Sequence, residues 1–256
     1  MTSPAAQRLL DAVRTGVPCA PVRDLIGAED IAAAYAVQRE QTELRLKTRR
    51  LVGHKIGLTS PAVQKQLGVD QPDFGVLFED MDVSGLDPVP VSGLLQPRIE
   101  AEVAFLLKAD LVGDFTAEDV RAAVDVMAPA LEIVDSRVAG WDISIADTIA
   151  DNASSGLFVL GAARKTLDEV NPVDIQMEMT VGGEVVSKGS GAACLGDPLA
   201  ALAWLATAAR DYGDPLRAGQ VVLSGALGPM VPVTPGMRVS ATLTGLGTVA
   251  TNFGDA

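Results

Sequence analysis

The chain has 256 residues, of which 48% are hydrophobic and only 4% are aromatic, and its formal net charge is −13. This length and composition fit a globular protein whose sizeable core is built from aliphatic side chains. The acidic balance predicts repulsion from nucleic acids and from anionic membranes, so we expect neither as a partner.

The N-terminal stretch lacks the uninterrupted apolar core of a signal peptide, and no segment approaches the roughly 18 apolar residues of a membrane-spanning helix. Cys19 and Cys194 are too few for a disulfide framework and lack the C-x-x-C spacing of zinc and redox motifs. We therefore expect a cytoplasmic protein. The single histidine, His54, excludes metal motifs that need two.

In chain order, apolar side chains recur at helical spacing over residues 30–46, which predicts an amphipathic helix within a helical arm that covers residues 1–46. From residue 47 to residue 256, short apolar runs between Gly and Pro predict a β-rich core. We expect a single domain of the α+β class, because strands and helices neither alternate regularly nor form separate blocks.

Three further elements are expected inside the β-rich part. A helix is predicted over residues 116–127 with Thr116 as its N-cap, and another begins at Asp197 and ends before Gly213. Gly182-Gly183 lies between two alternating segments, where a two-residue hairpin turn needs positive φ angles.

Residues 98–107 are typical of a core strand but carry two acids. Because side chains alternate along a strand, Glu100 and Glu102 share one face, where paired charges cost desolvation free energy unless a cation compensates them. Glu132, another lone acid in an apolar segment, would complete a set of oxygen donors that suits Mg²⁺ or Mn²⁺. Solvated positions or salt bridges with nearby arginines are the alternative.

Other polar residues also lie in apolar or turn-rich surroundings. Lys55 in "GHKIGLTS" is an acid/base candidate if it is buried and a surface charge if it is not. Asp73 in "GVDQPDFG" fits either a functional group or an ordinary turn, and the serines of "DTIADNASSG" can simply bond the local backbone. For His54 we favour a structural role over a catalytic one.

Several motifs together resemble the hydratase/decarboxylase family of aromatic meta-cleavage pathways, within the fumarylacetoacetate hydrolase superfamily. They are "GHKIGLTSPAVQKQLGVDQPDFGVLFEDM", "QPRIEAEVAFLL", "ALEIVDSRVAGWDISIADTIADNASSGLFVLG" and "GQVVLSGALGPMVPVTPG". The resemblance runs from about residue 30 to the C-terminus. It implies a rolled mixed β-sheet with flanking helices, a homo-oligomer and a divalent metal, Mg²⁺ or Mn²⁺.

The resemblance also implies roles position by position. The metal ligands would be Glu100, Glu102 and Glu132. Lys55 would be the acid/base residue, and Asp73 would be a second polar group beside the substrate. Ser154 and the backbone near Leu67 would contact the substrate. Ser155 is an adjacent candidate for the role of Ser154. The hydrolase branch resembles a scheme in which a His paired with an acid activates water, and His54 as the only histidine makes that scheme less fitting here.

The implied activity is hydration of 2-hydroxypenta-2,4-dienoate, or a substituted analogue, to a 4-hydroxy-2-oxo acid. One alternative is decarboxylation of diacids of the 4-oxalocrotonate type, which would need an additional cation from Arg98, Arg137 or Lys65. Another is a non-catalytic subunit that supports a pathway partner enzyme. The complete set of candidate site residues favours an enzyme.

Overall fold

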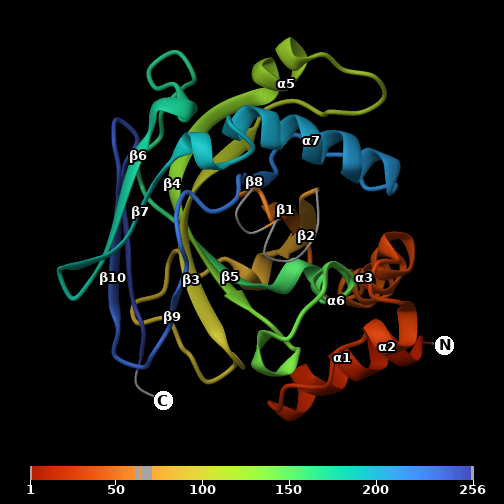
Figure 1. Ribbon diagram of the computed structural model, residues 1–256. Coiled ribbons are helices and arrows are strands. Elements are labelled where there is room, and N and C mark those ends of the chain that lie inside the picture. The colour runs from red at the N-terminus through yellow and green to blue at the C-terminus, as the bar shows by residue number, and fades with distance from the viewer. Residues whose placement is uncertain (1, 61–63, 65–70, 255–256) are drawn as a thin grey trace.

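The computed structural model describes residues 2–60, 64 and 71–254 of the chain. Leu67 and Lys65 therefore lie outside the described residues. Two β-sheets with helices packed around them build the fold (Figure 1).

The helices and strands have the following bounds. The α-helices are α1 Pro4–Thr15, α2 Arg23–Ile26, α3 Ile31–Arg45, α5 Ala117–Ala123, α6 Ile145–Ala150 and α7 Pro198–Asp211. Short 3₁₀ turns are η1 Glu79–Met81, η2 Ala139–Trp141, η3 Asn152–Ser154, η4 Pro172–Asp174 and η5 Gly191–Ala193. The strands are β1 Leu51–Gly57, β2 Asp73–Phe78, β3 Pro97–Leu107, β4 Val124–Asp135, β5 Ser155–Leu160, β6 Gln176–Val181, β7 Glu184–Ser190, β8 Val221–Leu223, β9 Val231–Pro232, β10 Arg238–Leu243 and β11 Gly247–Asn252.

The larger sheet has the strand order β2-β1-β8-β3-β4-β5, with β9 paired to β3. It is mixed, because β1 and β8 are parallel while its other pairs are antiparallel. The first and last strands of this order, β2 and β5, contact each other, so the sheet curls around an interior. Such a rolled mixed sheet with flanking helices confirms the expected α+β fold class.

The smaller sheet, β11-β10-β6-β7, is antiparallel throughout and lies at the left of Figure 1. Its β6–β7 hairpin turns at Gly182 and Gly183, whose φ angles are 58° and 92°. The expected positive φ at both positions is confirmed. Alternation along β6 buries Met177 and Met179 in the core and leaves Glu178 exposed.

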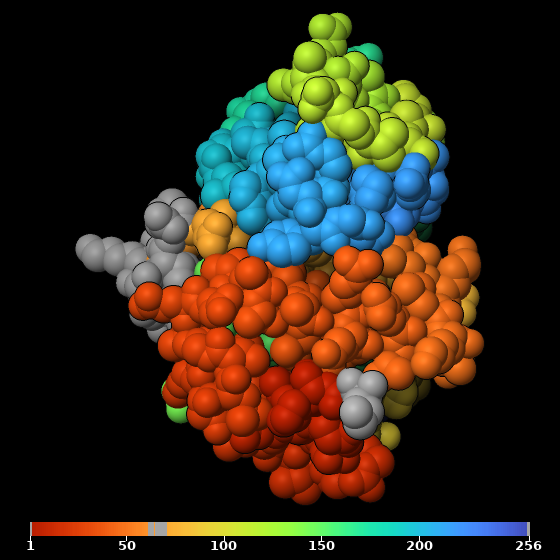
Figure 2. Space-filling model, turned by 90° about the vertical axis from the view of Figure 1, so that its right-hand side faces the viewer, coloured from red at the N-terminus to blue at the C-terminus, as the bar shows by residue number. Residues whose placement is uncertain are grey.

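Among the N-terminal helices, α3 contacts the strand β2. Side chains cap their starts, with Ser3 accepting from Ala6 N–H and Asp30 accepting from Ala33 N–H. On α3, the buried Gln38 donates to the carbonyl of Phe74 in β2. Figure 2 shows these red and orange helices below the blue α7. The expected division of one domain at residue 47 stays a prediction.

The helix expected over residues 116–127 is too long, because α5 ends at Ala123 and β4 begins at Val124. Thr116 caps the helix as expected. The residues that follow pair with β3, with Val126 opposite Leu106 and Met127 opposite Phe105. Pairing in a buried sheet outweighs the weak helical periodicity of "VDVM".

The stretch Gly191–Asp211, which includes α7, is long and apolar enough by length and composition to cross a membrane, contrary to the expectation from the sequence. Six of its side chains are fully buried in the hydrophobic core, namely Cys194, Ala201, Leu202, Leu205, Ala206 and Ala209. A core helix passes the same test of length and composition, so the stretch is weak evidence for a membrane span.

Candidate active site

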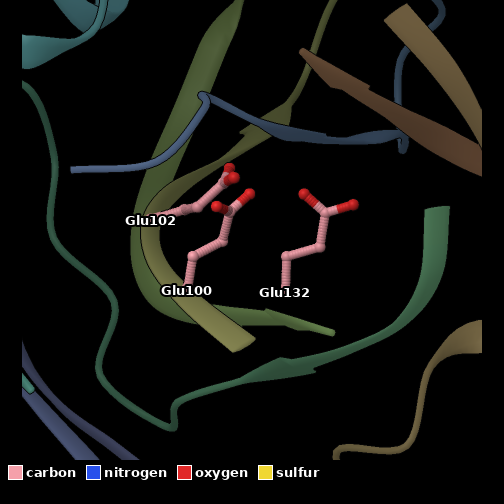
Figure 3. Close-up of side chains that lie close together, drawn as sticks. All are labelled: Glu100, Glu102 and Glu132. Atoms are coloured by element: carbon pink, nitrogen blue, oxygen red, sulfur yellow. The ribbon is translucent and has the colours of Figure 1, made fainter. Parts of the chain in front are cut away.

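Three glutamates meet inside the curled sheet. Glu100 of β3 lies directly opposite Glu132 of β4, and Glu102 follows two residues along β3 on the same face. One carboxylate oxygen from each lies within 4.8 Å of the others. Figure 3 shows the three side chains reaching into the same space. Alternation along β3 predicts that Glu100 and Glu102 share a face, and the strand register adds Glu132 to them.

These carboxylates lack sufficient hydrogen-bond donors. Glu102 and Glu132 are almost fully buried. Glu102 Oε2 accepts from the Gly225 N–H at 2.7 Å, whereas Glu102 Oε1 and Glu132 Oε2 have no donor among the described residues. Burial, reinforced by the neighbouring carboxylates, raises the pKa of Glu102 well above its usual value and that of Glu100 to about 7. Buried oxygens without donors need a positive charge, and oxygen donors of this kind could hold a hard divalent ion.

Lys55 reaches the same cluster from β1. It is 3% exposed, and its Nζ lies 3.3 Å from Glu132 Oε1. Burial alone lowers the pKa of this ammonium group, but the surrounding carboxylates, with Glu132 first, outweigh burial and raise it. The neighbouring carboxylates therefore favour the charged form of Lys55 beside Glu132.

Asp73 lies near Lys55 because Gly57, which has no side chain, leaves room for its carboxylate. Gly57 of β1 pairs with Asp73 of β2, and a Cβ atom at Gly57 would overlap Asp73 Oδ1 and lie 3.5 Å from Lys55 Nζ. Asp73 Oδ2 accepts from Thr148 Oγ1 at 3.3 Å, whereas Oδ1 has no donor among the described residues. Burial raises the pKa of Asp73 against the opposing effect of Lys55.

Ser154 is held by an unusual turn. Asn152, Ala153 and Ser154 all have φ between 51° and 54°, a left-handed conformation that non-glycine residues rarely adopt in succession. The Asn152 side chain accepts from Val76 N–H at 2.8 Å and donates to Val76 C=O at 2.9 Å, which clamps the turn onto β2. Ser154 Oγ thereby lies 3.3 Å from Thr148 Oγ1.

The structure distinguishes Ser154 from its competitor Ser155. Ser154 lines the central cavity, whereas Ser155 Oγ donates to the Asn152 carbonyl at 2.8 Å and does not line it. Thr148, which no sequence pattern marked, joins Asp73 and Ser154 in one hydrogen-bonded chain. Its only signal was its place in the polar run "DTIADNASSG".

A cavity of about 760 Å³ connects these groups. Its polar part is lined by Lys55, Asp73, Glu100, Thr148 and Ser154. Its apolar part includes Val134, Trp141, Ile143, Leu227, Pro229 and Met230. The cavity can therefore hold a small polar head group together with an apolar chain.

Two residues weighed in the sequence lie away from the cavity. His54 points to the opposite face of β1, where its Nε2 lies 3.0 Å from Asp214 Oδ2. Arg137 pairs with the buried Asp151 and donates to the carbonyl of Ser155 at 2.8 Å. Of the three cations considered for a second carboxylate, Arg98 lines the cavity.

Residues 56–253 match the C-terminal domain of the fumarylacetoacetate hydrolase family. The chain therefore belongs to this family. The predicted family is thus confirmed. The TodF product hydratase of Pseudomonas putida F1 is 53% identical over 254 residues, which cover 98% of this chain and 95% of that protein. The 2-keto-4-pentenoate hydratase of Paraburkholderia xenovorans LB400 is 49% identical over 251 residues, which cover 97% and 93%.

A solved structure extends the likeness to three dimensions. The 4-oxalocrotonate decarboxylase from Pseudomonas putida G7, complexed with magnesium and adipate, matches with a TM-score of 0.92 at 35% identity. The match covers 97% of this chain and 95% of that one. Relatives of both the hydratase and the decarboxylase type therefore share this fold.

Gly57→Ala should separate Asp73 from Lys55, because the new Cβ overlaps the Asp73 carboxylate. We expect the turnover rate with a 2-hydroxy-dienoate to fall about 100-fold, as for a group displaced by about 1 Å, while the melting temperature changes little. Gly85→Ala is the matched control, since a Cβ there meets nothing within 4 Å. Equal rates for the two variants would contradict the requirement for a glycine at Gly57.

Asn152→Ala should release the left-handed turn, because both bonds to Val76 are lost. We expect the free energy of unfolding to fall by about 2 kcal/mol and the turnover rate to fall about 10-fold. Urea denaturation and steady-state kinetics measure the two effects. Asn171→Ala, which removes an exposed bond to Asp174, is the control. An Asn152→Ala protein with unchanged stability and rate would show that the clamp is dispensable.

Proposed function

We propose that the chain is a hydro-lyase that hydrates 2-hydroxypenta-2,4-dienoate, or a substituted analogue, to a 4-hydroxy-2-oxo acid with Mg²⁺ or Mn²⁺. The observation that carries the proposal is the cluster of Glu100, Glu102 and Glu132, with Lys55 Nζ 3.3 Å from Glu132 and with Lys55 and Glu100 lining one cavity. The hydratase names of relatives about 50% identical over nearly the whole chain support it.

In this proposal the three glutamates hold the divalent ion. Glu102 Oε1 and Glu132 Oε2 are buried without a donor among the described residues, and the three carboxylates approach one another within 4.8 Å. Such a set suits a hard cation that keeps positions for substrate oxygens. When bound, such an ion supplies Lewis-acid stabilisation of the negative charge on the substrate's 2-oxygen. The magnesium in the decarboxylase structure supports a divalent ion here as well.

Proton transfer falls to the chain's own residues. The 2-hydroxyl proton must leave and C5 must gain a proton, which converts the dienol into a conjugated 2-oxo-3-enoate. Water then adds its hydroxyl at C4 and a proton reaches C3. Lys55, protonated beside Glu132, is placed to donate, and Asp73 has one oxygen without a donor that can accept.

Ser154 and Thr148 position the substrate in this scheme. Their hydroxyls lie 3.3 Å apart at the cavity wall, and Thr148 in turn bonds to Asp73. A substrate oxygen bound by Ser154 would therefore be connected to Asp73 through the hydrogen bonds of Thr148. The apolar lining beyond them would contact the apolar part of the substrate.

Decarboxylation of a vinylogous 2-oxo diacid is a second candidate. It is favoured by one specific observation, namely that Arg98 lines the cavity and contacts no carboxylate among the described residues.

We also propose that the protein is a homo-oligomer in the cytoplasm and works with a pathway partner enzyme. Composition and the family resemblance support these three proposals.

The direct test offers purified protein 2-hydroxypenta-2,4-dienoate with Mg²⁺. We expect loss of dienol absorbance and formation of 4-hydroxy-2-oxopentanoate. Lys55→Met should lower the turnover number about 10²- to 10⁴-fold, the usual contribution of a general acid or base, and Lys165→Met, on a surface pair with Glu169, should not. Carbon dioxide release from a diacid without hydration would instead identify a decarboxylase, and inertness toward both substrates a non-catalytic subunit.

Metal dependence has its own test. Exhaustive chelation should abolish turnover and added Mg²⁺ or Mn²⁺ should restore it. Glu100→Gln should weaken Mn²⁺ binding, measured by electron paramagnetic resonance, by more than the roughly 10- to 100-fold typical of an outer-shell change. Glu178→Gln, which removes a surface acid paired with Lys188, is the control. Full activity after chelation would overturn the assignment of all three ligands.

A further inference from the structure

The edge strand β2 is held by side chains of α3. Because β2 is the first strand of the larger sheet, one side of its backbone pairs with no described strand. Both polar groups of Phe74 bond to α3 instead: Tyr35 Oη accepts from the Phe74 N–H at 3.3 Å, and Gln38 Nε2 donates to the Phe74 carbonyl at 2.8 Å. Tyr35 and Gln38 are three residues apart, which puts them on one face of α3.

Gln38 joins two segments that carry residues of the candidate active site. Besides bonding to Phe74, its Nε2 donates to the Ile149 carbonyl of α6 at 3.0 Å. Asp73 directly precedes Phe74, and Thr148 directly precedes Ile149. Asp73 Oδ2 accepts from Thr148 Oγ1 at 3.3 Å. One side-chain amide therefore connects the two backbone segments whose side chains form this bond.

The chemistry of this bridge requires an amide. A carboxamide nitrogen carries two N–H donors, and here both acceptors are backbone carbonyls, which cannot donate. A carboxylate or an apolar side chain of similar length offers no donor to either carbonyl. Gln38 is 4% exposed and both bonds are buried, so a carbonyl left without this donor is costly. The amide thus fixes the spacing between β2 and α6.

Gln38 acts from outside the cavity. Asp73 and Thr148 line the cavity, whereas Gln38 is not part of its lining. Alternation along β2 puts Phe74 on the opposite face from Asp73. Helix α3 also lies outside residues 56–253, the part that matches the family's C-terminal domain, although it packs beside α6 (Figure 1). The influence of Gln38 on the site therefore passes through the backbone that it holds.

We propose that Gln38 is a positioning residue, which holds Asp73 and Thr148 at hydrogen-bonding distance and so keeps Asp73 in place for proton transfer. The N-terminal arm thereby takes part in building the site. The proposal rests on the proposed function in one respect, because it takes Asp73 as the proton acceptor of that reaction. The Asn152 side chain bonds both backbone groups of Val76, two residues further along β2, so side chains hold this strand edge at two successive outward positions.

A second glutamine of the same helix provides the matched control. Gln41 Nε2 donates to the carbonyls of Ala150 in α6 and of Val37, and these bonds leave β2 out. We expect Gln38→Met to lower kcat for 2-hydroxypenta-2,4-dienoate about 10-fold with little change in KM, because a displaced reacting group costs rate. Gln41→Met should keep the wild-type kcat. Both variants lose buried bonds and should melt earlier than the wild type, so lost stability alone does not produce the difference in rate.

A double-mutant cycle tests whether Gln38 acts through the bond between Thr148 and Asp73. Thr148→Val removes the hydroxyl that bonds to Asp73. In that background Gln38→Met should cause no further loss of kcat, because the bond that it protects is already absent, whereas independent effects would multiply. Crystal structures supply a readout without turnover. The Asp73 Oδ2–Thr148 Oγ1 pair should leave hydrogen-bonding range in Gln38→Met and stay near 3.3 Å in Gln41→Met.

An unchanged Asp73–Thr148 bond in Gln38→Met, equal kcat values for the two glutamine variants, or multiplicative losses in the cycle would each overturn the proposal. If Gln38→Met does not fold, Tyr35→Phe takes its place in both measurements, because it removes the acceptor of the Phe74 N–H and keeps the ring. A wild-type protein that hydrates no dienoate refutes the proposed function, and the Asp73–Thr148 distance in the variants still decides whether Gln38 positions the pair.

Discussion

The close approach of three carboxylates, two of them buried, to one ammonium group is the constraint on which the rest of the structure depends. Removing an ionised carboxylate from water costs several kcal/mol even after relaxation, and Glu132 and Glu102 are almost fully buried. With all four groups ionised, the glutamates and Lys55 carry a net charge of two negative units, which one divalent ion would cancel. The curled sheet is what brings β1 close enough to β4 for Lys55 to take part.

The backbone around this cluster is shaped to let side chains approach. Gly57 leaves room for Asp73, and the left-handed turn that ends at Ser154 is clamped by Asn152 to β2. Residues held in rarely populated conformations persist only where their surroundings determine them, and they concentrate at functional sites. Here the strained turn delivers the Ser154 hydroxyl to the chain that leads through Thr148 to Asp73.

Local patterns predicted much of this arrangement, and long-range pairing decided what they missed. Alternation put Glu100 and Glu102 on one face, but only the β3–β4 register sets Glu132 opposite Glu100. Because of the same pairing, α5 ends at Ala123, four residues before the end that periodicity predicted for this helix. Thr148 and Trp141 escaped notice because single polar or aromatic residues carry no period, and their role follows from contacts with segments far along the chain.

Charge also explains why an acidic protein can take an anionic substrate. A net charge of −13 repels small anions at long range, so attraction must come from local cations whose fields the low-dielectric walls concentrate. Lys55 is already engaged by Glu132, and Arg137 by Asp151. Arg98 is the cavity-lining arginine that no described carboxylate neutralises, so its charge is available to attract an incoming anion. The same lack of a protein partner that makes Arg98 costly to bury is what makes it available to a ligand.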